Sequence, residues 1–196
     1  MGSRRDQILA AAAELFARHG FHGVGIDEIG AAVGISGPAL YRHFRSKDAM
    51  LGEMLTSISD ILLAGGLERR DRTEDPAKLL GELVAFHVDF ALDNPALITV
   101  QERNLGNLTE PDRRRVRAQQ RRYVEVWVQA IRDTAPPLDE PAARAAAHAV
   151  FGLINSTPHS RYLGRDAMAT MLRDMALGAL ANAAAETARD EDSPTT

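Results

Sequence analysis

Apolar residues along the chain recur at the spacing of amphipathic helices, and no segment alternates with the two-residue period of a β-strand. The clearest pattern lies in GIDEIGAAVGISGPALYRHFRSK, residues 25–47, around which the rest of the chain is organised. Ile26, Ile29 and Val33 recur at helical spacing and predict a short helix with one apolar side. Gly34 is expected to end this helix, because glycine adopts the left-handed backbone of a helix end without a Cβ penalty.

A second short helix is predicted after a tight turn through Ile35. Ser36 can cap this helix, and Pro38 falls in its first turn, where a backbone N–H is not needed. Leu40 and Phe44 are four residues apart and form its inward side. The outward side is small, aromatic and basic, and it comprises Gly37, Pro38, Ala39, Tyr41, Arg42 and His43. Two short helices arranged in this way describe a helix-turn-helix, whose second helix enters the major groove of DNA.

The motif resembles the DNA-binding domain of the TetR/AcrR family of one-component repressors. The resemblance rests on Gly20-Phe21, on IDEIGAAVGIS and on ALYRHFRSK, and it covers about the first third of the chain. It implies a DNA-binding domain over residues 1–64, with the helix-turn-helix at about 25–44 and the outward residues against base edges and nearby phosphates. An ordinary helical hairpin, in which the same side chains are merely solvated, is the alternative.

The resemblance also implies contacts to the phosphate backbone outside the second helix. Lys47 stands where the family pattern has a lysine that contacts the backbone. Arg4 and Arg5 begin the first helix, whose N-terminus lies near DNA in families of this type; unstructured terminal charges are the alternative for these two arginines. Gly25 departs from the family pattern, which usually has serine or threonine there, so this residue offers no hydroxyl to a phosphate.

The remaining chain is predicted to be helical, with proline and glycine marking the ends of its helices. A helix over residues 47–64 joins the two halves and is expected to break at Gly65-Gly66, after which the polar run 68–75 forms a linker. We therefore predict an all-α protein of about nine helices. Three belong to the DNA-binding domain and six to a second domain, residues 65–186, which the resemblance assigns to ligand binding and dimerisation. The mostly acidic stretch 187–196 is expected to be a disordered tail.

Composition narrows the function classes. The chain has 196 residues, of which 45% are hydrophobic, so it can bury a core. It has no run of roughly 18 apolar residues and no apolar signal region, which predicts a cytoplasmic protein without a membrane partner. The absence of cysteine excludes disulfides, thiolate catalysis and cysteine-ligated zinc. The formal net charge of −4 opposes DNA binding, but residues 34–47 hold three cations and no acid, so positive charge is focused on the motif.

The last two helices, about 142–156 and 166–184, are nearly apolar on all sides, which suits helices buried between two subunits. The resemblance implies that these helices form a four-helix interface between two copies, and hence a homodimer that binds a palindromic operator. The alternative is that both helices pack inside one subunit.

The second domain is also expected to hold a pocket for a small-molecule inducer. Aromatic and polar residues on three separate helices have the composition of such a pocket, although any one of them is more often a core residue than a ligand contact: Phe86, His87, Phe90, Tyr123, Trp127, Phe151 and Asn155. Residues 113–122 add six arginines with no acid between them, which form either a solvated face or an anchor for a polyanion. In the second interpretation, Arg121 and Arg122 bind the phosphates of a CoA thioester whose acyl group enters the apolar pocket. QERNL at residues 101–105, followed by these arginines, resembles regulators of acyl-CoA and sterol catabolism.

No pattern of catalytic or cofactor-binding residues stands out. The six histidines include no pair with the helical spacing and adjacent glutamate of a zinc protease, and the glycine-rich residues 20–25 lack the Lys-Ser/Thr of a phosphate loop. We therefore expect no enzyme activity, metal or cofactor; a helical-bundle enzyme or a metal-binding protein without DNA function is the alternative. The sequence predicts a ligand-responsive DNA-binding regulator, a repressor that an inducer releases from its operator.

Overall fold

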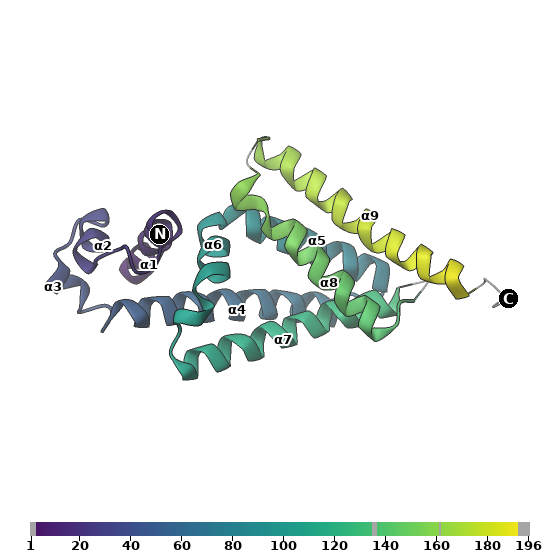
Figure 1. Cartoon of the computed structure of the whole chain (residues 1–196), viewed down its shortest axis with the longest axis horizontal. Coiled ribbons are helices and arrows are strands. Elements are labelled where there is room, and N and C mark those ends of the chain that lie inside the picture. The colour runs from purple at the N-terminus through teal and green to yellow at the C-terminus, as the bar shows by residue number, and fades with distance from the viewer. Residues whose placement is uncertain (1–2, 135–136, 161, 192–196) are drawn as a thin grey trace. The chain divides into compact units, whose positions relative to one another are not determined.

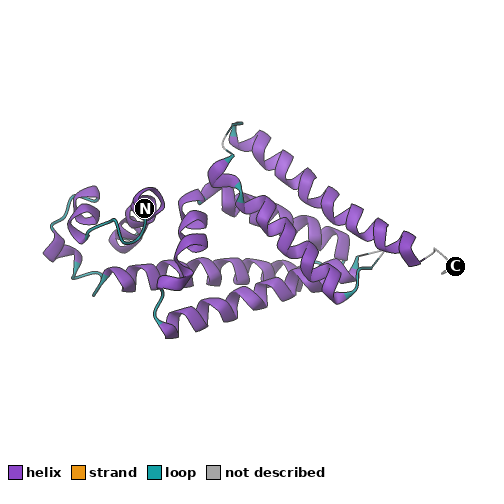
Figure 2. Ribbon diagram, in the orientation of Figure 1, coloured by secondary structure: helices purple, strands orange, loops and turns teal. Residues whose placement is uncertain are grey.

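The computed structural model describes residues 3–134, 137–160 and 162–191, and these ranges contain nine α-helices, two short 3-10 helices and no strand (Figure 1, Figure 2). In chain order the elements are α1 (Arg4–His19), α2 (Ile26–Ala32), α3 (Gly37–Leu40), α4 (Lys47–Arg72), α5 (Pro76–Asp93), α6 (Pro95–Asn104), η1 (Leu105–Asn107), α7 (Glu110–Asp133), α8 (Glu140–Asn155), η2 (Thr157–His159) and α9 (Arg165–Glu191). The prediction of an all-α protein with about nine helices is confirmed.

The helices group into two compact units that do not follow the order of the chain. The first unit comprises the chain up to Asp60 together with Asn94–Ala118, and the second comprises Ile61–Asp93 with the chain from Gln119 onward. The helices α4 and α7 each contribute residues to both units. The predicted boundary after residue 64 lies close to the first division, but the sequence pattern did not predict that α6 and the start of α7 belong with the N-terminal residues.

In the first unit, α1 packs against α2 and α6. Ser3 accepts a hydrogen bond from the N–H of Asp6, whose carboxylate accepts one from the N–H of Ser3, so a capping box begins the helix. The apolar side of α1 then buries Ile8, Ala12 and Phe16 at helical spacing. This side forms the support on which the helix-turn-helix rests.

The predicted break at Gly65-Gly66 is wrong, because α4 continues without interruption from Lys47 to Arg72. A Cβ at Gly65 would lie 2.6 Å from Cε1 of Phe86, and one at Gly66 would lie 2.8 Å from Cε2 of Tyr123. The two glycines therefore admit rings from α5 and α7 against the backbone of α4. This close approach offsets the helix-propensity penalty of glycine, which is about 1 kcal/mol relative to alanine.

The helix α4 is long and apolar enough to cross a membrane, since it contains an 18-residue window of mean hydropathy 1.3. However, 61% of that window is buried inside the structure. Burial of this extent is typical of a core helix in a soluble protein, so the apolar residues of α4 are accounted for by packing.

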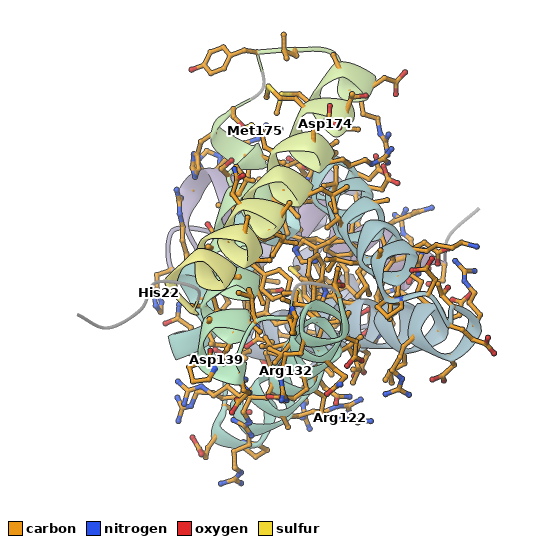
Figure 3. All side chains as sticks on the ribbon, turned by 90° about the vertical axis from the view of Figure 1, so that its right-hand side faces the viewer. His22, Arg122, Arg132, Asp139, Asp174 and Met175 are labelled. Atoms are coloured by element: carbon orange, nitrogen blue, oxygen red, sulfur yellow. The ribbon has the colours of Figure 1, made fainter. Side chains whose placement is uncertain are left out.

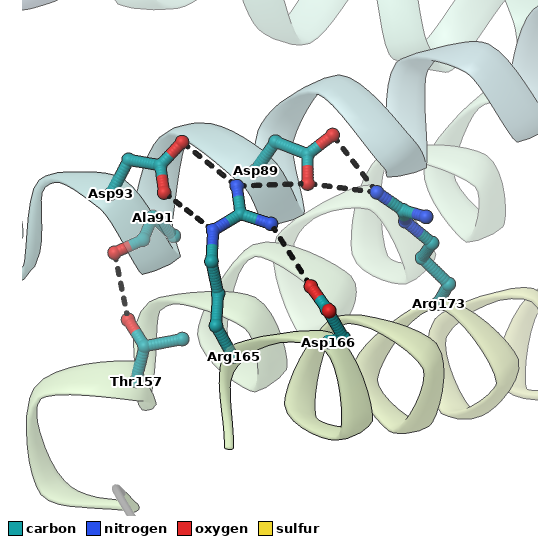
Figure 4. Close-up of polar contacts among 7 residues, drawn as sticks. All are labelled: Asp89, Ala91, Asp93, Thr157, Arg165, Asp166 and Arg173. Carbon is teal, nitrogen blue, oxygen red and sulfur yellow. Dashed lines mark hydrogen bonds and ion pairs between the residues drawn. The ribbon is translucent and has the colours of Figure 1, made fainter.

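In the second unit, α9 packs against α5 and α8. A network of ion pairs joins the start of α9 to the end of α5 (Figure 4). Arg165 donates two hydrogen bonds of 2.7 and 2.8 Å to Asp93, and Asp89 pairs with both Arg165 and Arg173. The hydrogen bonds from Arg165 lower the pKa of Asp93. These contacts fix the first turns of α9 on α5.

The helix α9 begins at Arg165, one residue before the predicted start at about 166, and it continues to Glu191, beyond the predicted end at about 184. The predicted disordered tail is therefore wrong for residues 187–191, which are helical. Residues 192–196 of that tail lie outside the described residues.

Candidate DNA-binding and ligand-binding sites

The helices α2 and α3 and the turn between them form a closely packed helix-turn-helix within the first unit (Figure 1). Gly34 has a φ of +71°, the left-handed backbone that was predicted to end α2. The N–H of Ile35 donates to the carbonyl of Gly30 at 2.9 Å, and a Cβ at Gly30 would lie only 2.7 Å from the carbonyl oxygen of Ile35. Glycine is therefore needed at Gly34 for its backbone angle and at Gly30 for the close approach of the turn.

The second helix of the motif is shorter than the sequence predicts. It comprises the four residues Gly37–Leu40, and the hydroxyl of Ser36 caps it by accepting a hydrogen bond from the N–H of Ala39. Beyond α3 the backbone continues in turns, in which the N–H of Arg42 donates to the carbonyl of Ala39. This bond spans three residues rather than four, as in a 3-10 turn. The predicted helix through residue 44 is thus wrong beyond α3, and we call residues 41–44 the reading turn.

Five of the six residues predicted to face DNA have an accessible side chain. Pro38, Tyr41 and Arg42 are exposed, and Tyr41 exposes 55% of its surface. Ala39 and His43 are half-buried. The accessible face therefore lies at the end of α3 and on the reading turn.

Gly37, the sixth residue predicted to face DNA, is buried. A Cβ at this position would lie 3.3 Å from Cγ of Asp27 and would collide with one of its carboxylate oxygens. The prediction that Gly37 faces DNA is therefore wrong: the space of its missing side chain is occupied by the carboxylate of Asp27 on α2.

Two cations that were predicted to contact phosphates bind backbone carbonyls of the first unit. The Nζ of Lys47 donates to the carbonyl oxygens of Phe21 and Val24 at 2.7 and 2.8 Å, which fixes the loop between α1 and α2. The guanidinium of Arg4 donates to the carbonyl oxygen of Val33 at the end of α2. The sequence pattern gave no signal for either contact, because each joins residues far apart in the chain.

Arg5, the third such cation, forms an ion pair with Glu53 on α4. This pairing raises the pKa of Arg5, through its hydrogen bonds to Glu53. By contrast, Arg42 and Arg45 are exposed, and their side chains form no hydrogen bond or ion pair with any residue that the structure describes. Arg45 was not among the predicted DNA contacts, although it belongs to the acid-free segment of the motif.

The second unit brings together most of the aromatic residues that were predicted to line a pocket. Centroids of neighbouring rings lie 4.9–6.2 Å apart in a cluster formed by His87, Tyr123, Trp127 and Phe151. We call these four residues the aromatic cluster. Phe90 is buried as well, but Phe86 packs instead beneath Arg69, whose Cζ lies 4.0 Å from the centre of its ring.

His87 joins three helices through two hydrogen bonds. Its Nε2 lies 3.1 Å from Oδ1 of Asn155 on α8, and its Nδ1 lies 3.2 Å from the hydroxyl of Tyr123 on α7. With the amide orientation assigned to Asn155, Nε2 carries the proton and Nδ1 accepts from the tyrosine. Burial lowers the pKa of His87 to about 4 and raises that of Tyr123, so both side chains are neutral at pH 7.

Trp127 gives the aromatic cluster a polar group that is not satisfied. Its indole Nε1 is buried and makes no hydrogen bond of normal geometry with any described residue, although the hydroxyl of Tyr123 lies close enough to interact with it. A buried N–H without an acceptor is unfavourable by about 1–3 kcal/mol. The indole is therefore a candidate donor for an acceptor atom of a bound small molecule.

The arginine cluster predicted on α7 is divided between the two units. In the first unit, Arg113 and Arg114 both pair with Glu110. In the second unit, Arg121 and Arg122 are exposed (Figure 3 labels Arg122). Arg122 also lines a groove of about 370 Å³, together with Leu67, Arg70, Glu125, Val126 and Gln129. Part of the predicted cluster thus forms ion pairs, and Arg122 offers positive charge beside a groove.

Apolar side chains remain exposed on α9. Met171 and Met175 lie one helical turn apart and expose 39% and 50% of their surfaces, and Leu177 exposes 37% (Figure 3 labels Met175). Met171 and Met175 therefore leave an apolar strip exposed on one side of α9.

Histidines of the described chain lie in separate environments. His22 contacts the side-chain oxygen of Asn107 in the first unit, whereas His87 belongs to the aromatic cluster of the second. Within residues 3–134, 137–160 and 162–191, no group of three or more His, Cys, Asp or Glu residues is placed to hold a metal ion.

Two sequence models of protein families match separate parts of the chain. Residues 8–54 match the model described as bacterial regulatory proteins of the tetR family, and residues 73–159 match a tetracyclin repressor-like C-terminal domain. The first match contains the helix-turn-helix, and the second contains the whole aromatic cluster.

Known regulators are similar to the chain over part of their length. The transcriptional activator FasR from Mycolicibacterium smegmatis is 38% identical over 87 residues, which are 44% of this chain and 40% of FasR. The transcriptional repressor KstR2 from Mycobacterium tuberculosis is 28% identical over 138 residues, which are 68% of this chain and 69% of KstR2. The chain therefore matches less than half of FasR and about two thirds of KstR2.

Solved structures share the fold over nearly the whole chain. A TetR-family regulator from Bordetella parapertussis superposes with a TM-score of 0.78 at 26% identity, covering 90% of this chain and 95% of the other. AibR in complex with isovaleryl coenzyme A and operator DNA superposes with a TM-score of 0.71 at 20% identity, covering 88% of this chain and 97% of AibR. At the lower identity the likeness shows the fold alone.

Proposed function

The chain belongs to the TetR family of bacterial regulatory proteins, and on that premise we propose that it is a repressor that a small-molecule ligand releases from operator DNA. The observation that carries the proposal is the reading turn. Tyr41 and Arg42 are exposed there, directly after a short capped helix that packs against α2. Repression is favoured because KstR2, the relative matched over most of its length, is a repressor.

We propose that base edges are contacted by exposed residues at the end of α3 and on the reading turn. Arg42 can donate two hydrogen bonds to O6 and N7 of a guanine in the major groove, while Tyr41, Pro38 and Ala39 contact neighbouring bases or phosphates. His43 and Arg45 flank this face. Lys47 keeps a third N–H beyond the two that it donates to the α1–α2 loop, and this group is available to a phosphate.

The operator would be read by two copies. A helix-turn-helix dimer binds half-sites about 34–36 Å apart, so a palindromic operator is expected. We place the subunit interface on α8 and α9, because Met171 and Met175 leave apolar surface exposed on α9.

For the ligand we propose an acyl-CoA thioester or another apolar anion. KstR2 is described as a ketosteroid regulator, and AibR was solved with isovaleryl coenzyme A. The acyl group would contact the aromatic cluster, displacing the half-buried ring of Phe151, and its carbonyl would accept from Nε1 of Trp127. Asn155, Phe86 and Phe90 would line the same region. The phosphates would bind Arg121 and Arg122.

The DNA part of the proposal is tested by selecting duplexes from a random pool with the full-length protein, followed by a gel-shift titration of the selected duplex. We expect a palindromic sequence bound by two copies of the chain. If no duplex is enriched, the chain is not a sequence-specific regulator, and turnover assays on the helical bundle become the next step.

The ligand part is tested by adding acyl-CoA thioesters of increasing chain length to the protein–duplex complex. We expect release of the duplex, and we expect the variant Arg121→Ala/Arg122→Ala to need a higher ligand concentration. Arg132→Ala is the matched control, because Arg132 is an exposed arginine of the same helix that belongs to neither the groove nor the proposed anchor (Figure 3). If no acyl-CoA releases the duplex from the wild-type protein, this ligand class is wrong.

A further inference from the structure

One guanidinium joins three parts of the first unit. Arg5 lies in the first turn of α1, and its Nε donates to Oε1 of Glu53 on α4 at 2.7 Å. Its two terminal nitrogens donate to Oε2 of Glu53 and to the carbonyl oxygen of His43. The Cζ atom lies 4.0 Å from the centre of the Phe44 ring, within the range of a cation–π contact. Two of the four residues of the reading turn are therefore held by Arg5.

From this geometry we propose that Arg5 is a positioning residue for DNA recognition, which holds the reading turn in place without contacting DNA. The inference rests on the proposed function, because positioning matters only if Tyr41 and Arg42 read DNA. Since α3 ends before the reading turn, the turn keeps only part of the hydrogen-bond pattern of an α-helix. The N–H groups of Tyr41 and Phe44 donate to carbonyls four residues back, whereas those of Arg42 and His43 donate to carbonyls three residues back. The guanidinium adds to these local bonds, because it fixes the turn to α1 and, through Glu53, to α4.

The hydrogen-bond partners of Arg5 argue against a phosphate contact. A carboxylate already neutralises the guanidinium, so a phosphate would have to displace Glu53 from a bidentate pair. The side chains of Arg5 and Glu53 remain 44% and 35% exposed, and an ion pair with this exposure stabilises a fold only slightly. The effect of the pair is therefore expected in the placement of the reading turn more than in global stability.

The other cations of the first unit also fall into two groups, those that bind the protein itself and those that are free to bind DNA. Arg4 and Lys47 also donate to backbone carbonyls of the first unit, at the end of α2 and in the α1–α2 loop. Arg42 and Arg45 have no such partners among the described residues, so their guanidinium groups are available to DNA. Arg5 thus belongs to the cations that hold the domain together, and it differs from the other two in binding the reading turn itself.

Substitutions at Arg5 separate positioning from phosphate contact. Arg5→Lys keeps the charge but loses the bidentate and stacked geometry of the guanidinium. We expect both Arg5→Lys and Arg5→Ala to weaken binding to the selected duplex by about tenfold, the size of one lost hydrogen bond to a charged group. The slope of log affinity against log salt should stay at its wild-type value. A phosphate contact would instead reduce that slope by about 0.9 per contact in Arg5→Ala, and Arg5→Lys would bind nearly normally.

For a substitution at Glu53, positioning by Arg5 and a simple net-charge effect predict opposite changes in DNA affinity. Removing an acid from a DNA-binding domain should strengthen DNA binding if only net charge matters. Positioning by Arg5 predicts weaker binding for Glu53→Gln, because the guanidinium loses the partner that holds it. Glu14→Gln is the matched control: Glu14 is an exposed acid of α1 whose partner Arg18 lies on the same helix, and its loss should leave binding unchanged or slightly tighter.

The same inference can be measured without DNA. Amide hydrogen exchange of the wild-type protein and of Arg5→Lys should show faster exchange confined to residues 41–45 in the variant, with the same thermal midpoint. Equal exchange rates there would overturn the positioning role, even if the proposed function holds. If exchange is faster in the variant but the wild-type protein selects no duplex from the random pool, Arg5 does hold the turn and the proposed function is wrong.

Discussion

Gly65 on α4 lies directly against the ring of Phe86 on α5. A Cβ at this glycine would stand 2.6 Å from Cε1 and 2.9 Å from Cε2, so the ring occupies the space of the missing side chain. Arg69, one turn further along α4, donates to the carbonyl of Gly65 at 2.8 Å and lies over the same ring. The ring is therefore held between a helix backbone and a guanidinium.

We predict that Gly65→Ala destabilises the protein. Alanine improves helix propensity by about 1 kcal/mol, but forcing the Phe86 ring out of position costs about 1–3 kcal/mol, so the free energy of unfolding should fall by up to about 2 kcal/mol. Urea unfolding followed by far-UV circular dichroism measures this change. Gly81→Ala on α5 is the control, because a Cβ at Gly81 would meet no atom within 4 Å and should stabilise the protein.

The same glycine shows where sequence patterns mislead. Gly65-Gly66 predicts a helix break, and α4 nevertheless continues to Arg72, because the backbone exposed by each glycine is covered by a ring. Gly37 misleads in the same way, since its place on the outward side of a helical wheel predicts DNA contact. The structure shows instead that Gly37 is buried and that the carboxylate of Asp27 on α2 lies where its side chain would be.

Local signals were predictable, whereas contacts between distant segments were not. Ser36 as a cap, the positive φ of Gly34 and the start of α9 all follow from residues within a few positions of each other. The pairing of Arg5 with Glu53 joins residues 48 positions apart, and no periodicity or spacing rule indicates it. The membership of the aromatic cluster was predicted from composition, but its hydrogen bonds through His87 were not.

We predict that the stability of the protein falls between pH 7.5 and pH 5 because of His87. In the folded protein, burial lowers the pKa of this imidazole to about 4, whereas in the unfolded chain it titrates near its ordinary value of 6.5. Between these values only the unfolded chain binds the proton, so the free energy of unfolding decreases as the pH falls. The expected loss over this range is about 2 kcal/mol, measured by urea unfolding at each pH.

The variant His87→Gln identifies the group responsible for this loss. It should be less stable than the wild-type protein at pH 7.5 but should lose little further stability by pH 5. Three carboxylates have a lowered pKa, Asp93, Glu82 and Glu125. They lose their contribution only below their ordinary values, 3.8 for aspartate and 4.5 for glutamate, which lie outside the measured range. An equal slope in the variant would assign the pH dependence to another group.

For Arg42 we predict a loss of sequence discrimination. Arg42→Ala should weaken binding to the selected duplex by about 1–3 kcal/mol and relax the preference at one base pair, because a bidentate contact to a base is lost. Arg45→Ala is the comparison. It should weaken binding to all duplexes alike and reduce the salt slope by about 0.9 per contact, as expected for a phosphate contact. Gel-shift titrations on selected and scrambled duplexes distinguish the two patterns, and unchanged affinity would remove Arg42 from the proposed interface.

The subunit interface on α9 can be tested with a charge substitution that spares the fold. Met171 and Met175 expose 39% and 50% of their surfaces, so aspartate at both positions stays solvated in a single subunit. In a dimer that buries α9, the same two carboxylates would lose their hydration without gaining a partner, which is unfavourable by several kcal/mol. We therefore expect Met171→Asp/Met175→Asp to sediment with half the mass of the wild-type protein and to lose binding to the palindromic duplex.

The control for this prediction is Ile61→Asp. Ile61 on α4 is a comparably exposed apolar residue, at 49%, and it lies outside the proposed interface. It should keep both the dimer mass and the binding to the duplex. A dimeric double variant together with a monomeric Ile61→Asp would place the interface on α4 instead, because a buried unpaired carboxylate disrupts association only where the partner subunit excludes water from it.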